Sequence, residues 1–306
     1  MLPAALATIY VVWGSTYLAI RVMVETMPPL LSAGVRFAVA GAVFLAVLAL
    51  RGGLKRVRVG RRELAGAALI GTLLCFGGNG LVTVAERDVP SALAALIIGA
   101  VPLWVIVMRS LHGDRVPAAT VAGVLVGFLG LAVLLLPGDR PDDAPLGWTL
   151  VVVGASIFWA AGSFYSSRTP LPGDALVSTG WQMLLGGAGM VLVGSIAGEW
   201  GDVDPGAFDT DSVLAFLYLI VFGSWLAFTA YVWLLKHAPI STVATYAYVN
   251  PVIAIFLGWA ILEEEITALM LAGATAIVLS VATVVRREGG EDPMKEPAPA
   301  AEPARS

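Results

Sequence analysis

Charge is scarce in this sequence. Asp, Glu, Lys and Arg together make up 13% of its 306 residues, whereas an ordinary soluble domain carries about 25%. Hydrophobic residues make up 58% of the chain, and the mean hydropathy is +0.86. Because a water-soluble globule could not cover that much apolar surface, the composition indicates a protein embedded in lipid. Little length then remains for a separate soluble catalytic domain.

Several kinds of chemistry lack the residues they need. The single cysteine, Cys75, lies within an apolar run and cannot form an internal disulfide or a thiolate metal cage. The sequence has no Walker A motif and no HExxH motif, which ATP hydrolysis and metal-dependent proteolysis use. A net charge of -4 argues against nucleic acid, which requires clustered Lys and Arg. We therefore expect no cofactor, no metal ion and no enzymatic activity.

Ten apolar runs dominate the chain. About 20 apolar residues cross the approximately 30 Å hydrocarbon layer as a helix, and no alternating strand pattern of the β-barrel type is visible. The amino terminus lacks a basic segment and an early cleavage site, so we expect it to be a retained first span. Glycines dilute the third run, and a tight connection separates the eighth from the ninth. The runs are residues 5–24, 30–50, 64–85, 91–110, 117–137, 147–166, 175–198, 212–235, 240–261 and 266–285.

The basic residues fall mainly on one side of these runs. Lys and Arg hold loops on the cytoplasmic side, so the distribution predicts a multi-pass protein of the cytoplasmic membrane with both termini inside. The outer side carries only Arg87 and Arg140, and its loops are acidic at residues 199–211 and 263–265. The inner side carries Arg51, Lys55, Arg56, Arg58, Arg61, Arg62, Arg109, Arg115, Arg168, Lys236, Arg286, Arg287, Lys295 and Arg305.

The two halves of the chain resemble each other. We therefore predict a first repeat at residues 1–137, a second at 147–285, and a disordered cytoplasmic tail at 286–306. Five spans per half force the second repeat to enter the membrane from the opposite face, which predicts inverted repeats. An old duplication retained only for folding is the alternative. An offset of 146 residues pairs Trp13 with Trp159, Ser32 with Ser178, Gly34 with Gly180, Arg36 with Gln182 and Gly41 with Gly187, and an offset of 149 pairs Pro90 with Pro239, Pro102 with Pro251 and Asp114 with Glu263.

The chain also resembles a known family at several motifs. These are WGSTYLAIR from Trp13, PPLLSAGVRF from Pro28, GNGLVTVAERDVPSALAALI from Gly78, IFWAAGSFYSSR ending at Arg168, and YAYVNPVIAIFLGWAILEEEIT ending at Thr267. Together they are similar to the EamA-type proteins of the drug/metabolite transporter superfamily, over about residues 5–286. The resemblance implies a ten-helix inner-membrane carrier that exports small metabolites, amino acids or toxic compounds. The usual acidic residue before the fifth helix is represented by Asp114, which Arg115 follows.

Arg36 is a charged residue inside a predicted span. It lies about six residues into the second run, about 9 Å below the outer boundary at 1.5 Å per residue. Its guanidinium could hold the carboxylate or phosphate of a substrate. The alternative is structural, in which Arg36 snorkels and pairs with Glu25, Glu86 or helix-end carbonyls.

Acidic residues are absent from the interiors of the predicted spans, so the usual carboxylate relay for proton coupling is missing. Coupling through Glu25 or Glu86 at the boundary is a weaker option.

Asn250 and Pro251 mark the ninth run as the best candidate for the substrate site. Asn250 falls near the midplane, and Pro251 cannot donate a backbone hydrogen bond, so a carbonyl one turn back is freed. Tyr246 lies one turn before Asn250 on the same helix face. Pro102 is the matching break in the fourth run, and we expect both prolines to act as hinges; a purely structural kink is the alternative.

Aromatic and amide side chains complete the predicted site. Trp13 and Tyr17 share one helix face, and Trp159 is the counterpart of Trp13 in the second half. Asn79, Gln182 and Asn250 are the side-chain amides of the chain; each lines the site or joins two helices. We expect contacts from the first, third, fourth, sixth, eighth and ninth spans.

The predicted function is a secondary-active or facilitative carrier of a small organic solute, with membrane lipid as its surroundings. The alternative is a membrane-embedded enzyme that acts on lipid-linked substrates; it would need buried carboxylates or a His cluster, and His112 and His237 fall in predicted cytoplasmic connections. Gly123 and Gly127 are spaced as in a helix-dimerisation motif, so a homodimer is an open alternative to packing within the chain. The substrate, coupling ion, direction and oligomeric state do not follow from the sequence.

Overall fold

The computed structural model describes residues 1–135, 144–238, 240–243 and 245–290, and every regular element within them is helical. We refer to residues 1–135 as the first half and to the described residues from 144 onward as the second half. The first half contains α1 (Leu2–Met23), α2 (Pro29–Gly52), α3 (Leu54–Val57), α4 (Arg61–Gly71), the π-helical segment η1 (Thr72–Gly80), α5 (Leu81–Ala85), α6 (Ser91–Ile98), α7 (Val101–Leu111) and α8 (Ala118–Leu134). The second half contains α9 (Leu146–Ser166), α10 (Ala175–Ile196), the 3-10 turn η3 (Glu199–Asp202), α11 (Thr210–Tyr218), the π-helical segment η4 (Leu219–Leu226), α12 (Ala227–His237), α13 (Ile240–Val243), α14 (Tyr246–Leu262) and α15 (Ala268–Gly290).

Seven helices or helix groups of the described residues are long and apolar enough to cross a membrane. Three further apolar helices, at Ala118–Leu134, Tyr246–Leu262 and Ala268–Thr283, are 10–17 residues long, shorter than the roughly 20 residues that a span requires. Each of the ten apolar runs of the sequence overlaps one of these elements. The all-helical membrane architecture is therefore confirmed, and a count of ten crossings stays a prediction.

The carboxyl-terminal helix α15 is longer than its apolar run. It continues to Gly290, whereas the sequence predicted that a disordered tail would begin at residue 286. The rest of that predicted tail, residues 291–306, and Arg140 in the connection between the halves lie outside the described residues.

Proline marks the starts of several helices. Pro28, Pro90, Pro117 and Pro145 are the N-cap residues of α2, α6, α8 and α9. A proline has no N–H to leave unsatisfied at a helix start and cannot extend the preceding helix. These residues therefore separate consecutive apolar segments that hydropathy alone would merge.

Two π-helical segments interrupt corresponding helices of the two halves. Segment η1 lies between α4 and α5, and η4 lies between α11 and α12. At the sequence offset of 146 residues, most of η1 falls on η4. Each π turn carries one more residue than an α turn and shifts the helix face that follows it, and such segments occur frequently at functional sites.

Helices α2 and α10 cross at very short range. A Cβ atom on Gly34 would lie 2.9 Å from the carbonyl oxygen of Gly187, and one on Gly41 would lie 2.6 Å from that of Gly180. The contact is reciprocal, because a Cβ on Gly187 would lie 2.7 Å from the carbonyl oxygen of Gly34. Glycine on both helices lets the two backbones approach closely, as is common between helices in membranes.

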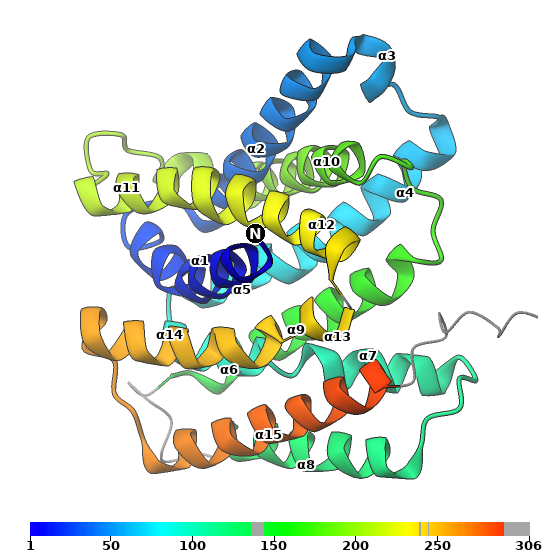
Figure 1. The fold of residues 1–306 in the computed structure, drawn as a ribbon. Helices are drawn as coiled ribbons and strands as arrows, with labels where there is room; N and C mark the ends of the chain where they lie inside the picture. The colour runs from blue at the N-terminus through cyan, green and yellow to red at the C-terminus, as the bar shows by residue number, and fades with distance from the viewer. Residues whose placement is uncertain (136–143, 239, 244, 291–306) are drawn as a thin grey trace, which may run out of the picture.

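The remaining helix pairs follow a similar pattern in the two halves. α1 packs against α14 and α12, while α9 packs against α6, α7 and η1. α8 and α15 lie side by side along one edge of the bundle, the edge farthest from α3 (Figure 1). Their contact uses the two glycines considered for dimerisation: Ser280 Oγ donates to the carbonyl of Gly123 at 2.5 Å and would lie 2.6 Å from a Cβ on Gly127. Both glycines thus pack within the chain.

The connections between helices gather into two groups. In one, Arg56 binds Asp174 at 2.8 Å, Arg109 binds Asp114 at 3.1 Å and Tyr165 Oη lies 3.2 Å from His112. In the other, Glu199 accepts hydrogen bonds from the N–H groups of Leu30 and Leu31, and Glu264 accepts them from Ser91 and Ala92. The two groups contain the connections that the charge pattern assigned to opposite sides of the membrane, and which group faces the cytoplasm stays a prediction.

Candidate binding cavity

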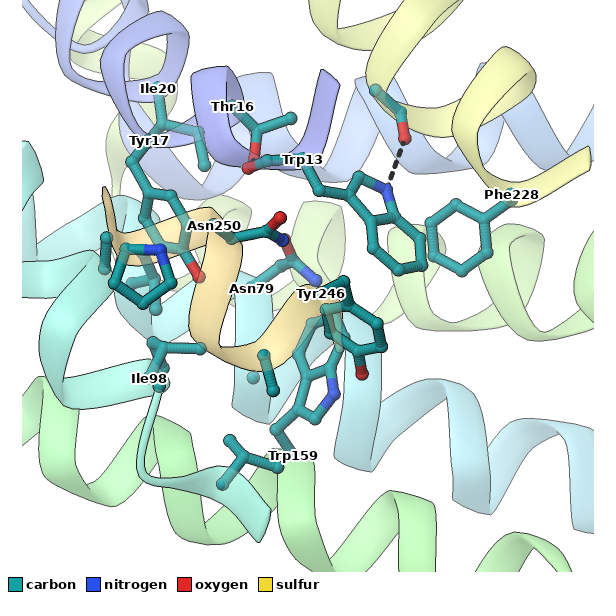
Figure 2. A pocket seen from close by; sticks show the side chains of 18 of the residues that line it. Trp13, Thr16, Tyr17, Ile20, Asn79, Ile98, Trp159, Phe228, Tyr246 and Asn250 are labelled. Atoms are coloured by element: carbon teal, nitrogen blue, oxygen red, sulfur yellow. Dashed lines mark hydrogen bonds between the residues drawn. The ribbon is translucent and has the colours of Figure 1, made fainter. Parts of the chain in front are cut away.

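A cavity of about 90 Å³ lies between the two halves of the molecule. Figure 2 shows it from close by, with side chains from α1, η1, α6, α9, α12 and α14 turned toward the same space. Its lining residues are Trp13, Thr16, Tyr17, Ile20, Arg36, Gly78, Asn79, Val82, Ala95, Ile98, Gly99, Val101, Pro102, Trp159, Gly223, Phe228, Tyr246, Ala247, Asn250 and Pro251.

The structure brings most of the sequence-predicted site residues to this cavity. Seven of them, with the two predicted hinge prolines, are among the lining residues: Trp13, Tyr17, Arg36, Asn79, Trp159, Tyr246 and Asn250, with Pro102 and Pro251. Gln182 is not among them. Its amide donates to Ser178 Oγ one turn earlier on α10, at 2.8 Å, and the backbone of Gln182 packs against Gly71.

Trp13 organises an aromatic wall on one side of the cavity. Its ring centroid lies 5.2 Å from those of Phe228, Tyr231 and Tyr246, in tilted or edge-on arrangements. Its indole N–H donates to the carbonyl oxygen of Gly223 at 3.3 Å (Figure 2). Edge-on aromatic contacts are favourable beyond their buried area, so three elements of the second half hold the Trp13 ring in place.

Two amides face the middle of the cavity. Oriented by its hydrogen bonds, the Asn250 side chain donates to the backbone carbonyls of Tyr10 on α1 and Tyr246 on α14, at 3.2 and 3.3 Å. Asn79 lies within η1, and its side chain donates weakly to the Leu74 carbonyl at 3.4 Å. Because amides carry both donors and acceptors, they can recognise an uncharged polar group of a solute. Figure 2 places both beside Tyr17 and Tyr246.

Arg36 is buried, which goes against the snorkelling alternative. Only 3% of the residue is exposed. Its Nε donates to Ser224 Oγ in η4 at 3.1 Å, and its guanidinium lies 4.5 Å from the centroid of the Phe37 ring. Nη1 has no hydrogen-bond partner among the described residues. Gly223 makes room for the guanidinium, because a Cβ there would lie 3.2 Å from Nη2.

The two hinge prolines have different surroundings. Pro102 lies in the first turn of α7, after a break at residues 99–100 between α6 and α7. Pro251 lies inside α14, which continues through it, so the carbonyl of Ala247 receives no backbone donor from it. Pro251 packs against the break that precedes Pro102, because a Cβ on Gly99 would lie 3.1 Å from Pro251 Cγ and 3.5 Å from the Ala247 oxygen.

Sequence reasoning missed some of the lining. Phe228 was not predicted, and neither π-helical segment was. The one available signal for η1 was the glycine-rich stretch around Gly78, which weakened the hydropathy of the third run. There, a Cβ on Gly78 would lie 2.7 Å from the Trp159 ring, so this glycine lets the aromatic side chain lie directly against the helix backbone.

The lining is suited to binding and holding a solute. It combines aromatic faces, two amides, hydroxyls and one guanidinium. Among the described residues, no group of three or more His, Cys, Asp or Glu side chains could hold a metal ion.

The family model of the EamA-like transporter family matches residues 3–136 and 146–286, which together make up most of the chain. The chain belongs to the EamA-like transporter family. The family's two matched segments coincide with the two halves that share the cavity, and membership favours a transporter over the membrane-embedded enzyme considered from the sequence.

Named relatives agree with this membership. An uncharacterized inner membrane transporter of Escherichia coli K12, YedA, is 39% identical over 281 residues, covering 92% of this chain and 89% of that protein. An uncharacterized transporter of Bacillus subtilis, YoaV, is 23% identical over 278 residues, covering 90% and 93%. One crystal structure has the same fold, with a TM-score of 0.62 at 24% identity, covering 94% of this chain and 98% of that one. This EamA family member is thus a multi-pass inner-membrane protein of a transporter family.

Proposed function

We propose that the protein is a secondary carrier that exports a small organic solute, such as a metabolite, an amino acid or a drug, by alternating access. The observation that carries the proposal is the cavity itself. Ten elements, six from the first half and four from the second, line it, so a relative movement of the halves would change access to its occupant. Substrate sites of transporters built from internal repeats lie at such an interface, near the middle of the membrane.

The α2–α10 contact supports inverted repeats. Gly34 contacts Gly187 and Gly41 contacts Gly180, while the sequence comparison equates Gly34 with Gly180 and Gly41 with Gly187. Replacing both residues of one contact pair by their counterparts therefore gives the other contact pair, which is the pattern of a two-fold axis. The two helices are antiparallel, because the contacts run up one helix and down the other. A two-fold axis that relates antiparallel helices is perpendicular to them, and this is also the direction of the axis between inverted repeats.

The proline segments support two exchangeable conformations. The first half breaks its helix at residues 99–100, immediately before Pro102. At the equivalent point of the second half, α14 is already helical from Tyr246 and continues through Pro251. The two halves thus have different conformations at their matching prolines. If each half took the conformation of the other, the cavity would open toward the other side, as alternating access requires.

Flux through reconstituted protein tests the proposal. Proteoliposomes containing the purified protein would be loaded with a panel of amino acids, sugars, organic acids and cationic dyes, and efflux would be followed with time. We expect saturable flux of at least one class. An Asn250→Leu variant should lose about tenfold or more of it, because leucine removes the amide that a polar solute would contact, a hydrogen bond of about 1 kcal/mol, and also the bonds that join α14 to α1 at Tyr10.

Thr275→Val is the matched control. Thr275 is exposed on α15, away from the cavity, and its hydroxyl bonds only within its own helix. This variant also replaces a polar side chain of a membrane helix with an apolar one, so it should transport normally. Undiminished flux in folded Asn250→Leu protein would remove the site assignment, and absence of flux for the whole panel would remove the carrier.

A further inference from the structure

Glu86 is a fully buried carboxyl group near the cavity. It follows directly after α5, one turn beyond the lining residue Val82, and none of its surface is exposed. Neither carboxylate oxygen has a hydrogen-bond partner among the described residues. An ionised carboxylate without partners is costly to bury, whereas a protonated carboxyl group is far less so.

Several ionisable groups face Glu86 from the elements packed around it. Arg21 on α1 uses its guanidinium to bond the backbone carbonyls of Glu86 and Arg87, and Tyr17 lies on the same helix. Arg36 approaches from α2, and Glu264 from the segment after α14. On α9, which also packs against α5, the titratable residue is Tyr165, beside His112 in the other group of connections.

Glu264 is a second buried acidic residue near Glu86. Its two oxygens accept hydrogen bonds from the N–H groups of Ser91 at 2.7 Å and Ala92 at 3.0 Å, at the start of α6. A helix amino terminus stabilises an ionised carboxylate. Burial, followed by the charge of Glu264, raises the pKa of Glu86 well above its ordinary value, against the opposing effect of Arg21 and Arg36.

Arg36 is a buried positive charge without a bonded negative charge among the described residues. It is a permanently charged, buried guanidinium in the cavity wall, and its Nη1 has no acceptor within the described part of the chain. When Glu86 carries a proton, the positive charge of Arg36 has no ionised acid bonded to it. A carboxylate of the solute would supply both the missing acceptor and the missing negative charge.

We infer that Arg36 binds the carboxylate of a small organic acid in the cavity and that Glu86 binds a proton with it, so that anion and proton are carried together. The inference rests on the proposed carrier function and names its substrate class. The positive charge of Arg36 alone favours the ionised form of Glu86. The bound carboxylate neutralises that charge, so the affinity of Glu86 for a proton rises. Linkage makes the effect reciprocal, because a proton on Glu86 must strengthen anion binding by the same factor.

The joint binding of anion and proton forms and breaks no bond to carbon, and its charges balance. One carboxylate enters from solution and accepts hydrogen bonds from Arg36, while one proton from water binds a Glu86 oxygen. The charge added to the protein is zero, so the loaded carrier can reorient without moving net charge across the membrane. Direction follows from the combined gradients of solute and proton, and an acid that accumulates inside leaves with its proton.

Binding measured at two pH values tests the inference. Lactate and pyruvate serve as carboxylate probes, because such α-substituted acids stay ionised above about pH 5, and their neutral amides serve as reference probes. Binding to the full-length protein in detergent would be followed by isothermal titration calorimetry at roughly pH 6 and roughly pH 8. We expect wild-type affinity for the carboxylates to be at least about fivefold higher at the lower pH, the lower end of ordinary coupling, with uptake of up to one proton per anion.

Three variants separate the inference from a merely structural role of these residues. Glu86→Gln should bind the carboxylates with little pH dependence and without proton uptake. Asp88→Asn, an exposed acid on the same turn, should keep the wild-type pH dependence. Arg36→Lys should lose carboxylate affinity while its amide binding changes little, because Lys keeps the charge without the planar pair of donors.

The outcomes distinguish failure of the inference from failure of the carrier. If neither carboxylate binds better than its amide, if the wild-type pH dependence is absent, or if Glu86→Gln retains it, the inference is wrong. A solute panel that still gives flux in proteoliposomes would then leave the carrier function standing with another substrate class. An infrared band of a protonated carboxyl group that grows when lactate is added near pH 7, and that is missing in Glu86→Gln, supports proton binding at Glu86. Its absence from the wild type with lactate bound would overturn the assignment to Glu86.

Discussion

At the scale of single residues, Asp174 has two tasks. One carboxylate oxygen caps α10 by accepting from the Leu176 N–H at 3.0 Å, and the other binds Arg56 at 2.8 Å. Partial burial acts to raise the pKa of Asp174, but the hydrogen bonds from Arg56 and from the backbone of Leu176 and Val177 outweigh it, and the pKa is lowered. Asp174 thus caps the amino terminus of α10 and also joins that terminus to α3.

Substitution of Asp174 separates these tasks. Asp174→Asn keeps a capping oxygen and loses the ion pair, which for a partly exposed pair contributes about 0.2–1 kcal/mol. Asp174→Ala also loses the cap and should cost about 0.5–2 kcal/mol more. Thermal unfolding in detergent measures both. Loss of the same stability in the two variants would contradict the capping role.

The sign of the pH dependence follows from the lowered pKa. A carboxyl group whose folded-state pKa is depressed contributes stability above its unfolded value and loses that contribution as the pH falls through the folded value. The unfolding temperatures of wild type and Asp174→Asn should therefore differ near neutral pH and converge below about pH 4. A difference that persists unchanged in acid would show that charge is not its cause.

Residue identity predicted the cavity better than it predicted the environment of each residue. Trp13 and Tyr246 were recognisable as aromatic residues deep inside apolar runs, and both line the cavity. The burial of Arg36 was not predictable, because its partner Ser224 lies 188 residues away in sequence. Gln182 occupies the equivalent position of the second half and faces its own helix instead. Equivalent positions of a repeat therefore need not share a role.

At the scale of elements, hydropathy located the helices and missed their irregularities. The apolar runs and their proline boundaries follow from single-sequence rules, because lipid demands both. The π-helical segments do not, since one extra residue per turn leaves the apolar run intact, and only the glycines of η1 weakened the hydropathy of theirs. The same holds for Glu264, which reaches the start of α6 only because Glu263 adopts a left-handed backbone conformation, with φ of 57°, after α14 ends.

The α2–α10 contact can be tested with one methyl group. A Cβ on Gly41 would lie 2.5 Å from the backbone nitrogen of Leu184, and backbone cannot move aside as a side chain can. Gly41→Ala should therefore lower stability by about 1–3 kcal/mol, the usual cost of overpacking. Loss of monodisperse protein on heating, followed by size-exclusion chromatography, provides the measurement.

Gly189→Ala is the control for this contact. Gly189 lies on the same helix, α10, and a Cβ there would have nothing within 4 Å. Alanine is the better helix former by about 1 kcal/mol, so this variant should be as stable as the wild type or slightly more so. If Gly41→Ala proved equally harmless, the close crossing of the two halves would be wrong.

At the scale of the whole molecule, the loop contacts and the charge pattern describe the same two sides. Arg56 and Asp174, both in connections expected inside, bind each other. Glu199 and Leu30, both expected outside, do likewise. Helices that pass between the two groups of connections place residues 51–62 and 199–211 at opposite ends of the bundle. Five predicted crossings separate these two connections, which is the parity that inverted halves require.

Accessibility of single thiols decides this parity. In a Cys75→Ser background, Asp204→Cys should react in intact cells with a membrane-impermeant maleimide, whereas Arg58→Cys should react only after permeabilisation. Gly173→Cys, next to the partner of Arg56, must behave like Arg58→Cys, because the two connections touch. All three sites are exposed in the structure, so differences in labelling report the side of the membrane. Equal labelling of Asp204→Cys and Arg58→Cys from outside would place the two connections on one face, and two halves with the same orientation could not exchange conformations about a shared cavity.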